Sequence, residues 1–260
     1  MLKIKEITSS NNCQIKLLRK LAQKKHRRQM GKFAVENLAI IIDALSGGID
    51  FLECFITPQM LQRHEDKLLW LQEHSKVAEF HLIDEDLNKS YSQLDTPSGI
   101  TALYEIKQLP LDGDAPTLYL NGIKDPGNIG TMLRSALAFD VSNIVLDAAC
   151  VDIYNFKAIN AAKDAIFKLN IFIDESGQWL KEQKGQVPIY VANSHEGIEL
   201  GAVEVKSKFC LVCGSESHGV SEDIIKMADK NIHIDISNKI ESLNVSTATA
   251  ILLHGLRKKL

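Results

Sequence analysis

The sequence lacks the features of a membrane or secreted protein. None of its apolar runs approaches the roughly 20 residues that a membrane-spanning helix needs, and the N-terminus lacks the apolar core of a secretion signal. Hydrophobic residues make up 45% of the 260 positions and charged residues 24%, as in globular domains. We therefore expect a cytoplasmic protein without a membrane partner, long enough for two domains.

The chain is also poor in cysteine. Its five cysteines are odd in number and scattered, which does not suggest a disulfide framework. Cys210 and Cys213 form a C-x-x-C, but no second pair of cysteines or histidines follows at the spacing of a zinc site. Because the pair lies in an apolar run that predicts a buried strand, we interpret both as core residues and expect no metal site.

Acidic residues are almost absent from the first 35 positions. This segment has ten lysines and arginines against one acid, Glu6, so its net charge is +9, while the whole chain has −3. A helix is predicted after the capping residues Ser9–Asn11, and its apolar face is formed by Ile15, Leu18, Leu21 and Ala22. Basic residues cover much of the rest of that helix. Such a stripe could be a solvated surface, but ordinary surfaces mix both signs, so we interpret it as a polyanion-binding surface.

Strand and helix patterns alternate along the remaining chain, which predicts an α/β fold in two parts. Residues 108–116 contain two prolines, a glycine and two aspartates without hydrophobic periodicity, as is typical of a linker. We predict a first domain at 1–107, a linker at 108–116 and a second domain at 117–260.

A polar loop near the C-terminus is the most unusual part of the second domain. Glu241–Ser246 joins a predicted strand at 232–236 to an apolar helix, and Leu243 interrupts its polar residues. A loop between a strand end and a helix start offers unpaired backbone groups to a ligand. Alternatively, it is a capped helix start in which Leu243 packs as a hydrophobic staple.

Two further stretches of the second domain have distinctive motifs. The stretch Asn121–Ala136 contains Asp-Pro-Gly-Asn followed by an arginine, and the stretch Leu211–Ser221 contains Gly-Ser-Glu. In order and spacing, these stretches and Glu241–Ser246 resemble the signature motifs of the SpoU/TrmH family of RNA 2'-O-ribose methyltransferases, in the SPOUT superfamily. The resemblance implies a trefoil-knotted α/β methyltransferase domain that uses S-adenosylmethionine, an active site built across a homodimer, and ribosomal or transfer RNA as substrate.

The first domain is similar to the L30e-like α/β substrate-binding domain of the family. The similarity rests on Arg27 and Arg28 with Phe33–Glu36 after them, and on Thr96–Ile100. Asn37 stands where the family usually has glycine, and asparagine can also adopt a left-handed turn.

The resemblance assigns roles to particular residues. It implies catalytic roles for Asn128, Arg134, Glu216, Ser242 and Asn244. It implies cofactor contacts for Gly214, Ile234, Ile236, Ser242 and Leu243, of which Gly214 lets a ligand approach the backbone. For RNA binding we select Lys24, Lys25, Arg27, Arg28 and Arg134, and we expect that neutralising the first four weakens RNA binding and flattens its salt dependence.

No matched residue is an obvious base for the ribose hydroxyl proton. The family account gives that task to the motif-one arginine, Arg134, assisted by a substrate phosphate. Because arginine stays protonated, Arg134 could instead bind the phosphate and stabilise the developing alkoxide. His218 is a third possibility, although we interpret a lone loop histidine as merely exposed.

Four further positions depart from the family pattern. Asn160, Ala162 and Asp164 stand where arginine, serine and glycine are common, and Asp235 replaces a proline. They motivate an alternative, a catalytically inactive RNA-binding protein of the same fold, which the five intact catalytic positions argue against. A dehydrogenase of Rossmann type is disfavoured because no G-x-G-x-x-G follows the first strand.

Overall fold

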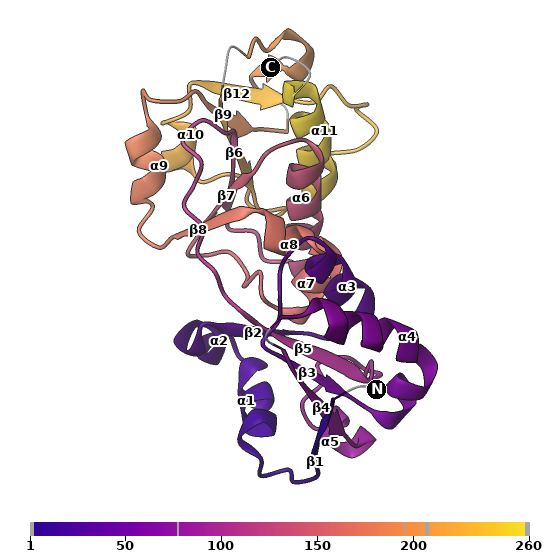
Figure 1. The fold of residues 1–260 in the computed structure, drawn as a ribbon. Helices are drawn as coiled ribbons and strands as arrows, with labels where there is room; N and C mark the ends of the chain where they lie inside the picture. The colour runs from indigo at the N-terminus through magenta and orange to yellow at the C-terminus, as the bar shows by residue number, and fades with distance from the viewer. Residues whose placement is uncertain (1–2, 77, 195, 206–207, 258–260) are drawn as a thin grey trace. The chain divides into compact units, whose positions relative to one another are not determined.

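The computed structural model describes residues 3–76, 78–194, 196–205 and 208–257. The chain divides into two compact units, and we describe each by itself (Figure 1). Unit 1 comprises Met1–Lys107 together with Tyr154–Asn160, and unit 2 comprises Gln108–Ile153 and Ala161–Leu260. Both units combine a sheet with helices, so the predicted α/β class is confirmed.

Unit 1 has a five-stranded mixed sheet. Its strands lie in the order β1 (Lys5–Ile7), β4 (Glu79–Ile83), β3 (Glu53–Ile56), β5 (Ile100–Glu105) and β2 (Lys32–Val35). The first three are parallel, and β5 is antiparallel to both of its neighbours.

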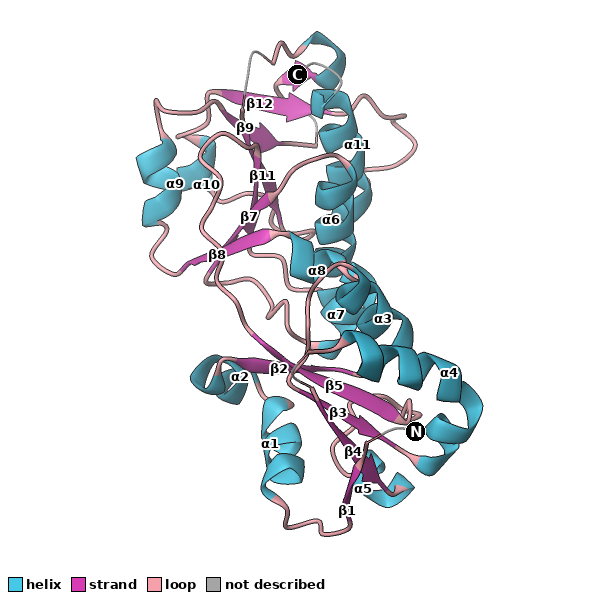
Figure 2. Cartoon of the chain, in the orientation of Figure 1, coloured by secondary structure: helices cyan, strands magenta, loops and turns pink. Residues whose placement is uncertain are grey.

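Helices cover both faces of this sheet. They are α1 (Cys13–Leu21), α2 (Lys24–Met30), α3 (Leu38–Ser46), α4 (Pro58–His74) and α5 (Glu85–Lys89). The predicted apolar face of α1 is buried, because Ile15, Leu18 and Leu21 share a core cluster with Phe55 and Leu103 of the sheet. Figure 2 shows α3 and α4 on the opposite side of the sheet from α1.

The basic segment forms two helices instead of the single predicted one. Helix α1 begins after Asn12, whose side chain accepts a hydrogen bond from the Gln14 N–H, so the cap lies one residue beyond the expected Ser9–Asn11. The chain turns at Ala22 and Gln23 before α2 begins. Helix α2 ends at Gly31, which has the left-handed conformation that glycine favours, with φ of 61°.

Asn37 does not form the left-handed turn that its alignment with glycine suggested. Its φ is −151°, and its side-chain oxygen accepts hydrogen bonds from the N–H groups of Ala39 and Ile40 at the start of α3. Asparagine is tolerated there because it caps a helix.

Unit 2 has a seven-stranded parallel sheet. Its strands lie in the order β10 (Ile198–Glu199), β12 (Lys230–His233), β9 (Ile189–Ala192), β11 (Cys210–Gly214), β6 (Thr117–Asn121), β7 (Asn143–Asp147) and β8 (Asn170–Asp174). The central strands are continuous apolar runs, which is typical of a parallel sheet covered on both faces.

Helices α6 (Pro126–Ala138) and α11 (Val245–Arg257) lie side by side on one face of this sheet, while α9 (Gln178–Gln183) and α10 (Glu222–Ile225) lie on the other (Figure 2). The short helices α7 (Phe156–Ala162) and α8 (Ala165–Lys168) precede β8, and a 3₁₀ turn covers Leu200–Ala202. None of the helices in the described part of the chain is both long and apolar enough to cross a membrane.

Two segments near the unit boundaries are held by specific contacts. Residues 108–116 have no helix or strand, and within unit 2 the Asn143 side chain binds both the N–H and the carbonyl of Asp112, at 2.9 and 2.7 Å. Within unit 1, the ring of Tyr154 lies 4.7 Å from that of Phe33. Tyr154–Asn160 therefore packs as part of unit 1 although it follows the first strands of unit 2 in sequence.

The sheet of unit 2 has a topological switch point between β6 and β11. After β6 the chain passes through α6 to β7, towards the β8 edge of the sheet. After β11 it passes through α10 to β12, towards the opposite edge. The two strands end together, with Asn121 paired to Gly214. Ligands of open α/β sheets bind at such carboxyl ends.

Candidate active site

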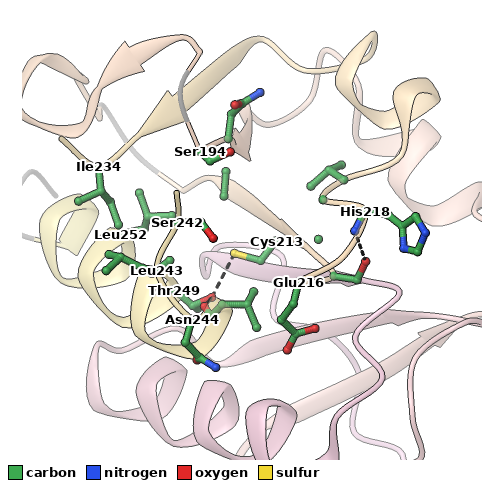
Figure 3. A pocket seen from close by; sticks show the side chains of 18 of the residues that line it. Ser194, Cys213, Glu216, His218, Ile234, Ser242, Leu243, Asn244, Thr249 and Leu252 are labelled. Atoms are coloured by element: carbon green, nitrogen blue, oxygen red, sulfur yellow. Dashed lines mark hydrogen bonds between the residues drawn. The ribbon is translucent and has the colours of Figure 1, made fainter. Parts of the chain in front are cut away.

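A cavity of about 550 Å³ lies at the carboxyl ends of β9, β11 and β12, a size that suits a nucleoside-sized ligand (Figure 3). The loops after these strands and the first turns of α11 form its lining. In Figure 3, the aliphatic side chains of Ile234, Leu243 and Leu252 gather at one end, and Glu216 and His218 lie at the other. The cavity therefore has an apolar end and a polar end.

The five residues proposed as cofactor contacts all line this cavity: Gly214, Ile234, Ile236, Ser242 and Leu243. Gly214 is the last residue of β11 and the other four lie in the loop after β12, so the two segments are adjacent only in the folded chain. Leu243 is half-buried, and its place in the cavity lining accounts for a leucine in an otherwise polar loop.

Gly214 also makes a close contact within the chain itself. A Cβ atom there would lie 2.1 Å from the carbonyl carbon and oxygen of Gly219, so the close approach is made by the protein's own backbone. Residues 215–219, here called the motif-two loop, fold back through paired hydrogen bonds between Ser215 and Gly219 of 3.1 and 2.9 Å. Glycine at 214 is therefore a condition for the shape of this loop.

Three of the predicted catalytic residues form one chain of hydrogen bonds. The Asn244 side-chain oxygen accepts from the N–H and hydroxyl of Ser246, at 2.9 and 2.6 Å, at the start of α11. Its amide nitrogen donates to the Asn128 side-chain oxygen at 3.1 Å, and the Asn128 amide nitrogen donates to Glu216. Each contact fixes the orientation of the next amide, so the chain runs from the N-terminus of α11 to a carboxylate at the cavity.

Arg134 does not line the cavity of its own chain, among the residues that the structure describes. It is exposed on α6, beyond Asn128, and it is not among the described residues that line the pocket. His218 is exposed at the polar end, and its Nδ1 lies 2.7 Å from the Ser217 hydroxyl, as expected for a loop histidine.

The four basic residues chosen for RNA binding differ in exposure. Lys25 and Arg28 are exposed on α2, and Lys24 is partly exposed. Arg27 is only 6% exposed, and its guanidinium donates to the Leu21 carbonyl oxygen at 2.6 Å. Arg27 therefore does not lie on the exposed basic surface, because it holds the turn between α1 and α2.

The four departures from the family pattern lie outside the cavity lining. Asp164 has an ordinary φ of −75°, and its carboxylate pairs with Lys168 at 2.5 Å, so glycine is not needed there. Ala162 is fully buried. Asn160 accepts a hydrogen bond from the Asn37 amide at 3.4 Å within unit 1, so two of the unusual positions contact each other. Asp235 is exposed between the two lining isoleucines.

The sequence did not predict the contribution of β9 or of the cavity floor. Ala192, Asn193 and Ser194 follow β9, and they line the cavity because parallel strands end at the same edge of the sheet. On the floor, the Thr249 hydroxyl donates to the Cys213 sulfur at 3.3 Å. Burial raises the pKa of the Cys213 thiol to about 12, so this cysteine stays protonated and unreactive at neutral pH.

Two family models match the chain. Residues 115–254 match the SpoU rRNA Methylase family, and residues 12–102 match the MRM3-like substrate binding domain. The chain is 27% identical over 256 residues to the 23S rRNA (guanosine(2553)-2'-O)-methyltransferase RlmP of Bacillus subtilis, covering 98% of this chain and 100% of that protein.

Solved structures of the same fold extend over the whole chain. A crystal structure described as an RNA 2'-O ribose methyltransferase superposes with a TM-score of 0.79 at 25% identity, covering 98% of both chains. The AdoMet-bound rRNA methyltransferase from Sinorhizobium meliloti gives a TM-score of 0.82 at 24% identity, covering 99% of this chain and 98% of that one. Since the family match spans more than half of the chain and includes every loop around the cavity, this protein belongs to the SpoU rRNA methylase family.

Proposed function

We propose that this protein transfers a methyl group from S-adenosylmethionine to a ribose 2'-hydroxyl of ribosomal RNA. Membership of the family makes it an RNA methyltransferase that depends on S-adenosylmethionine. The observation that carries the proposal is the convergence of Asn128, Glu216 and Asn244 beside a nucleoside-sized cavity. Ribosomal RNA and the 2'-hydroxyl are favoured by the name of the matched family and by the Bacillus subtilis relative.

The residues present fit S-adenosylmethionine. Ile234, Leu243 and Leu252 supply an apolar surface for a flat heterocycle, and the exposed carboxylate of Glu216 suits a positively charged ligand. Bound there, the cofactor would supply a methyl group on a cationic sulfur that already activates it. The protonated Cys213 thiol on the cavity floor would not compete for that methyl group.

The hydrogen-bonded side-chain amides connect the elements that surround the cavity. Asn244 caps α11 and Asn128 lies in the first turn of α6, so the two asparagines join the starts of neighbouring helices. Glu216 receives the last hydrogen bond of the series. We propose that this series fixes the motif-two loop in the geometry that binding requires.

Arg134 requires a second copy of the protein in this proposal. Because the side chain is exposed on α6 and absent from the described lining of its own cavity, we propose that a homodimer presents it to the partner's cavity. A permanently protonated guanidinium is a poor base, but it would bind the phosphate beside the target ribose and stabilise the developing alkoxide.

Substrate binding is assigned to unit 1. Residues 12–102 of this unit match a substrate-binding domain family, and the exposed cations of α1 and α2 provide the charge for a phosphate backbone. We further propose a cytoplasmic location, on the compositional grounds given above.

The test is transfer of labelled methyl from S-adenosylmethionine to unmodified ribosomal and transfer RNA, with nucleoside mass spectrometry of the product. We expect a 2'-O-methyl nucleoside from the wild type, and a loss of turnover of at least about a hundredfold in Arg134→Ala. Lys226→Ala is the control, because it removes an exposed cation of unit 2 just after α10 that pairs only weakly with Glu222, at 3.8 Å.

A base-methylated product would contradict the ribose assignment. Failure of the wild type to bind S-adenosylmethionine, with RNA binding intact, would instead support the inactive RNA-binding protein.

A further inference from the structure

Asp147 and Asn121 lie at the carboxyl ends of the neighbouring strands β7 and β6, next to the loop that carries Glu216. Neither residue lines the cavity. Both are partly buried, and Asn121 is paired in register with Gly214, the residue before the motif-two loop.

The Asp147 carboxylate accepts hydrogen bonds from three nitrogen donors. One oxygen, Oδ2, accepts from the Asn121 side-chain nitrogen at 2.7 Å. The other, Oδ1, accepts from the N–H groups of Gly122 at 3.1 Å and Ala149 at 3.0 Å. An ionised carboxylate can only accept, so it fixes which end of the Asn121 amide faces it.

The opposite end of the Asn121 amide reaches Ser221, two residues beyond the motif-two loop. Its oxygen Oδ1 accepts from the Ser221 N–H at 2.9 Å. Ser221 is the cap residue of α10, and its side chain makes no capping hydrogen bond. Residues 216–219 are all exposed, so this loop has little apolar packing and depends on hydrogen bonds for its position.

We propose that Asp147 and Asn121 are positioning residues for the cofactor cavity. Asp147 orients the Asn121 amide, and the oriented amide holds the Ser221 N–H, which fixes the loop that presents Glu216 to the cavity. The functional part of this inference rests on the proposed function, because it takes S-adenosylmethionine as the ligand.

The arrangement can be tested by exchanging the two side chains. In Asp147→Asn, the new amide oxygen still accepts hydrogen bonds from the N–H groups of Gly122 and Ala149. The new amide nitrogen then faces the Asn121 amide nitrogen, so two donors oppose each other. In Asn121→Asp, two carboxylates face each other. In the double variant, the amide at position 147 donates to the carboxylate at position 121, whose other oxygen accepts from Ser221.

We expect each single variant to weaken S-adenosylmethionine binding by at least about tenfold by calorimetry, and the double variant to return to within about threefold of the wild type. Asp164→Asn is the control, because it changes an Asp outside the cavity in the same way. A structural role alone would lower the melting temperature without this selective weakening and recovery of binding.

Hydrogen exchange provides a readout that does not need the cofactor. We expect the Ser221 amide to exchange faster in both single variants and to recover its protection in the double variant. Unchanged exchange in the single variants, or additive effects in the double variant, would overturn the positioning role. If the wild type fails to bind S-adenosylmethionine, the proposed function fails, and the exchange data still decide whether the pair positions the loop.

Discussion

At the scale of the residue, the site depends on side-chain amides whose two ends have different partners. Asn121, Asn128 and Asn244 each accept on one end and donate on the other. An amide can connect an N–H group to a carboxylate in this way, whereas a carboxylate or an ammonium cannot. This explains why asparagine is suited to these three positions around one cavity.

Gly214→Ala tests the tightest backbone contact at this scale. The new Cβ would lie 2.1 Å from the backbone of Gly219, so the motif-two loop must move. We expect S-adenosylmethionine binding to weaken at least about tenfold, or ~1.4 kcal/mol, as measured by calorimetry. Gly113→Ala is the matched control, because its Cβ would meet open space and its backbone is unstrained. Equal affinities for the wild type and Gly214→Ala would show that the loop tolerates displacement.

At the scale of the element, α1 and α2 separate two tasks that the sequence pattern assigned to one basic helix. Helix α1 buries Ile15, Leu18 and Leu21 in the core of unit 1. The turn that follows is held by Arg27, while Lys25 and Arg28 remain exposed on α2. A cation can thus be part of a basic segment and still be structural.

The combined variant Lys24→Gln/Lys25→Gln/Arg28→Gln should weaken RNA binding and reduce its salt dependence. The slope of log affinity against log salt should fall by roughly 0.7–0.9 for each phosphate that is no longer neutralised, with S-adenosylmethionine affinity unchanged. Filter binding at several salt concentrations measures this. Arg63→Gln/Lys67→Gln, on the exposed surface of α4, is the control. An unaltered slope in the α2 variant would move the RNA surface elsewhere.

At the scale of the whole molecule, the absence of Arg134 from the described lining of its own cavity is what motivates the proposed homodimer. Asn128 and Arg134 lie on the same helix, but in the part of the chain that the structure describes it is the Asn128 side chain that hydrogen-bonds a residue of the cavity lining. The proposed homodimer reconciles this separation with the implied catalytic role of both residues.

Mixing two inactive variants tests the shared site. If Arg134 acts in the partner's cavity, Arg134→Ala and Glu216→Ala should complement each other after subunit exchange. Half of the dimers would then be mixed, each with one intact site, so methyl transfer should recover to about a quarter of the wild-type rate. Mixing Arg134→Ala with Lys226→Ala is the control, because exchange leaves the number of intact sites unchanged and the rate should stay at about half of the wild-type rate. No recovery in a mixture shown to contain mixed dimers would place Arg134 in its own cavity.

The sequence determined the elements that local patterns encode. The period of its apolar residues predicted the alternating α/β order, and the three motifs indicated the family and the loops around the cavity. The limits of local patterns also explain the two local predictions that were wrong. The capping role of Asn37 and the break between α1 and α2 depend on hydrogen bonds that neighbouring residues can satisfy in more than one way.

Only the tertiary structure decided which residues meet. It brought Asn128 into hydrogen bonds with Glu216, 88 positions away, and with Asn244, 116 positions away. It also buried Arg27 while leaving Arg28 exposed. It also showed that Gly214 accommodates the backbone of Gly219. These facts depend on strand order and register, which bring distant segments to one edge of a parallel sheet and which no local pattern specifies.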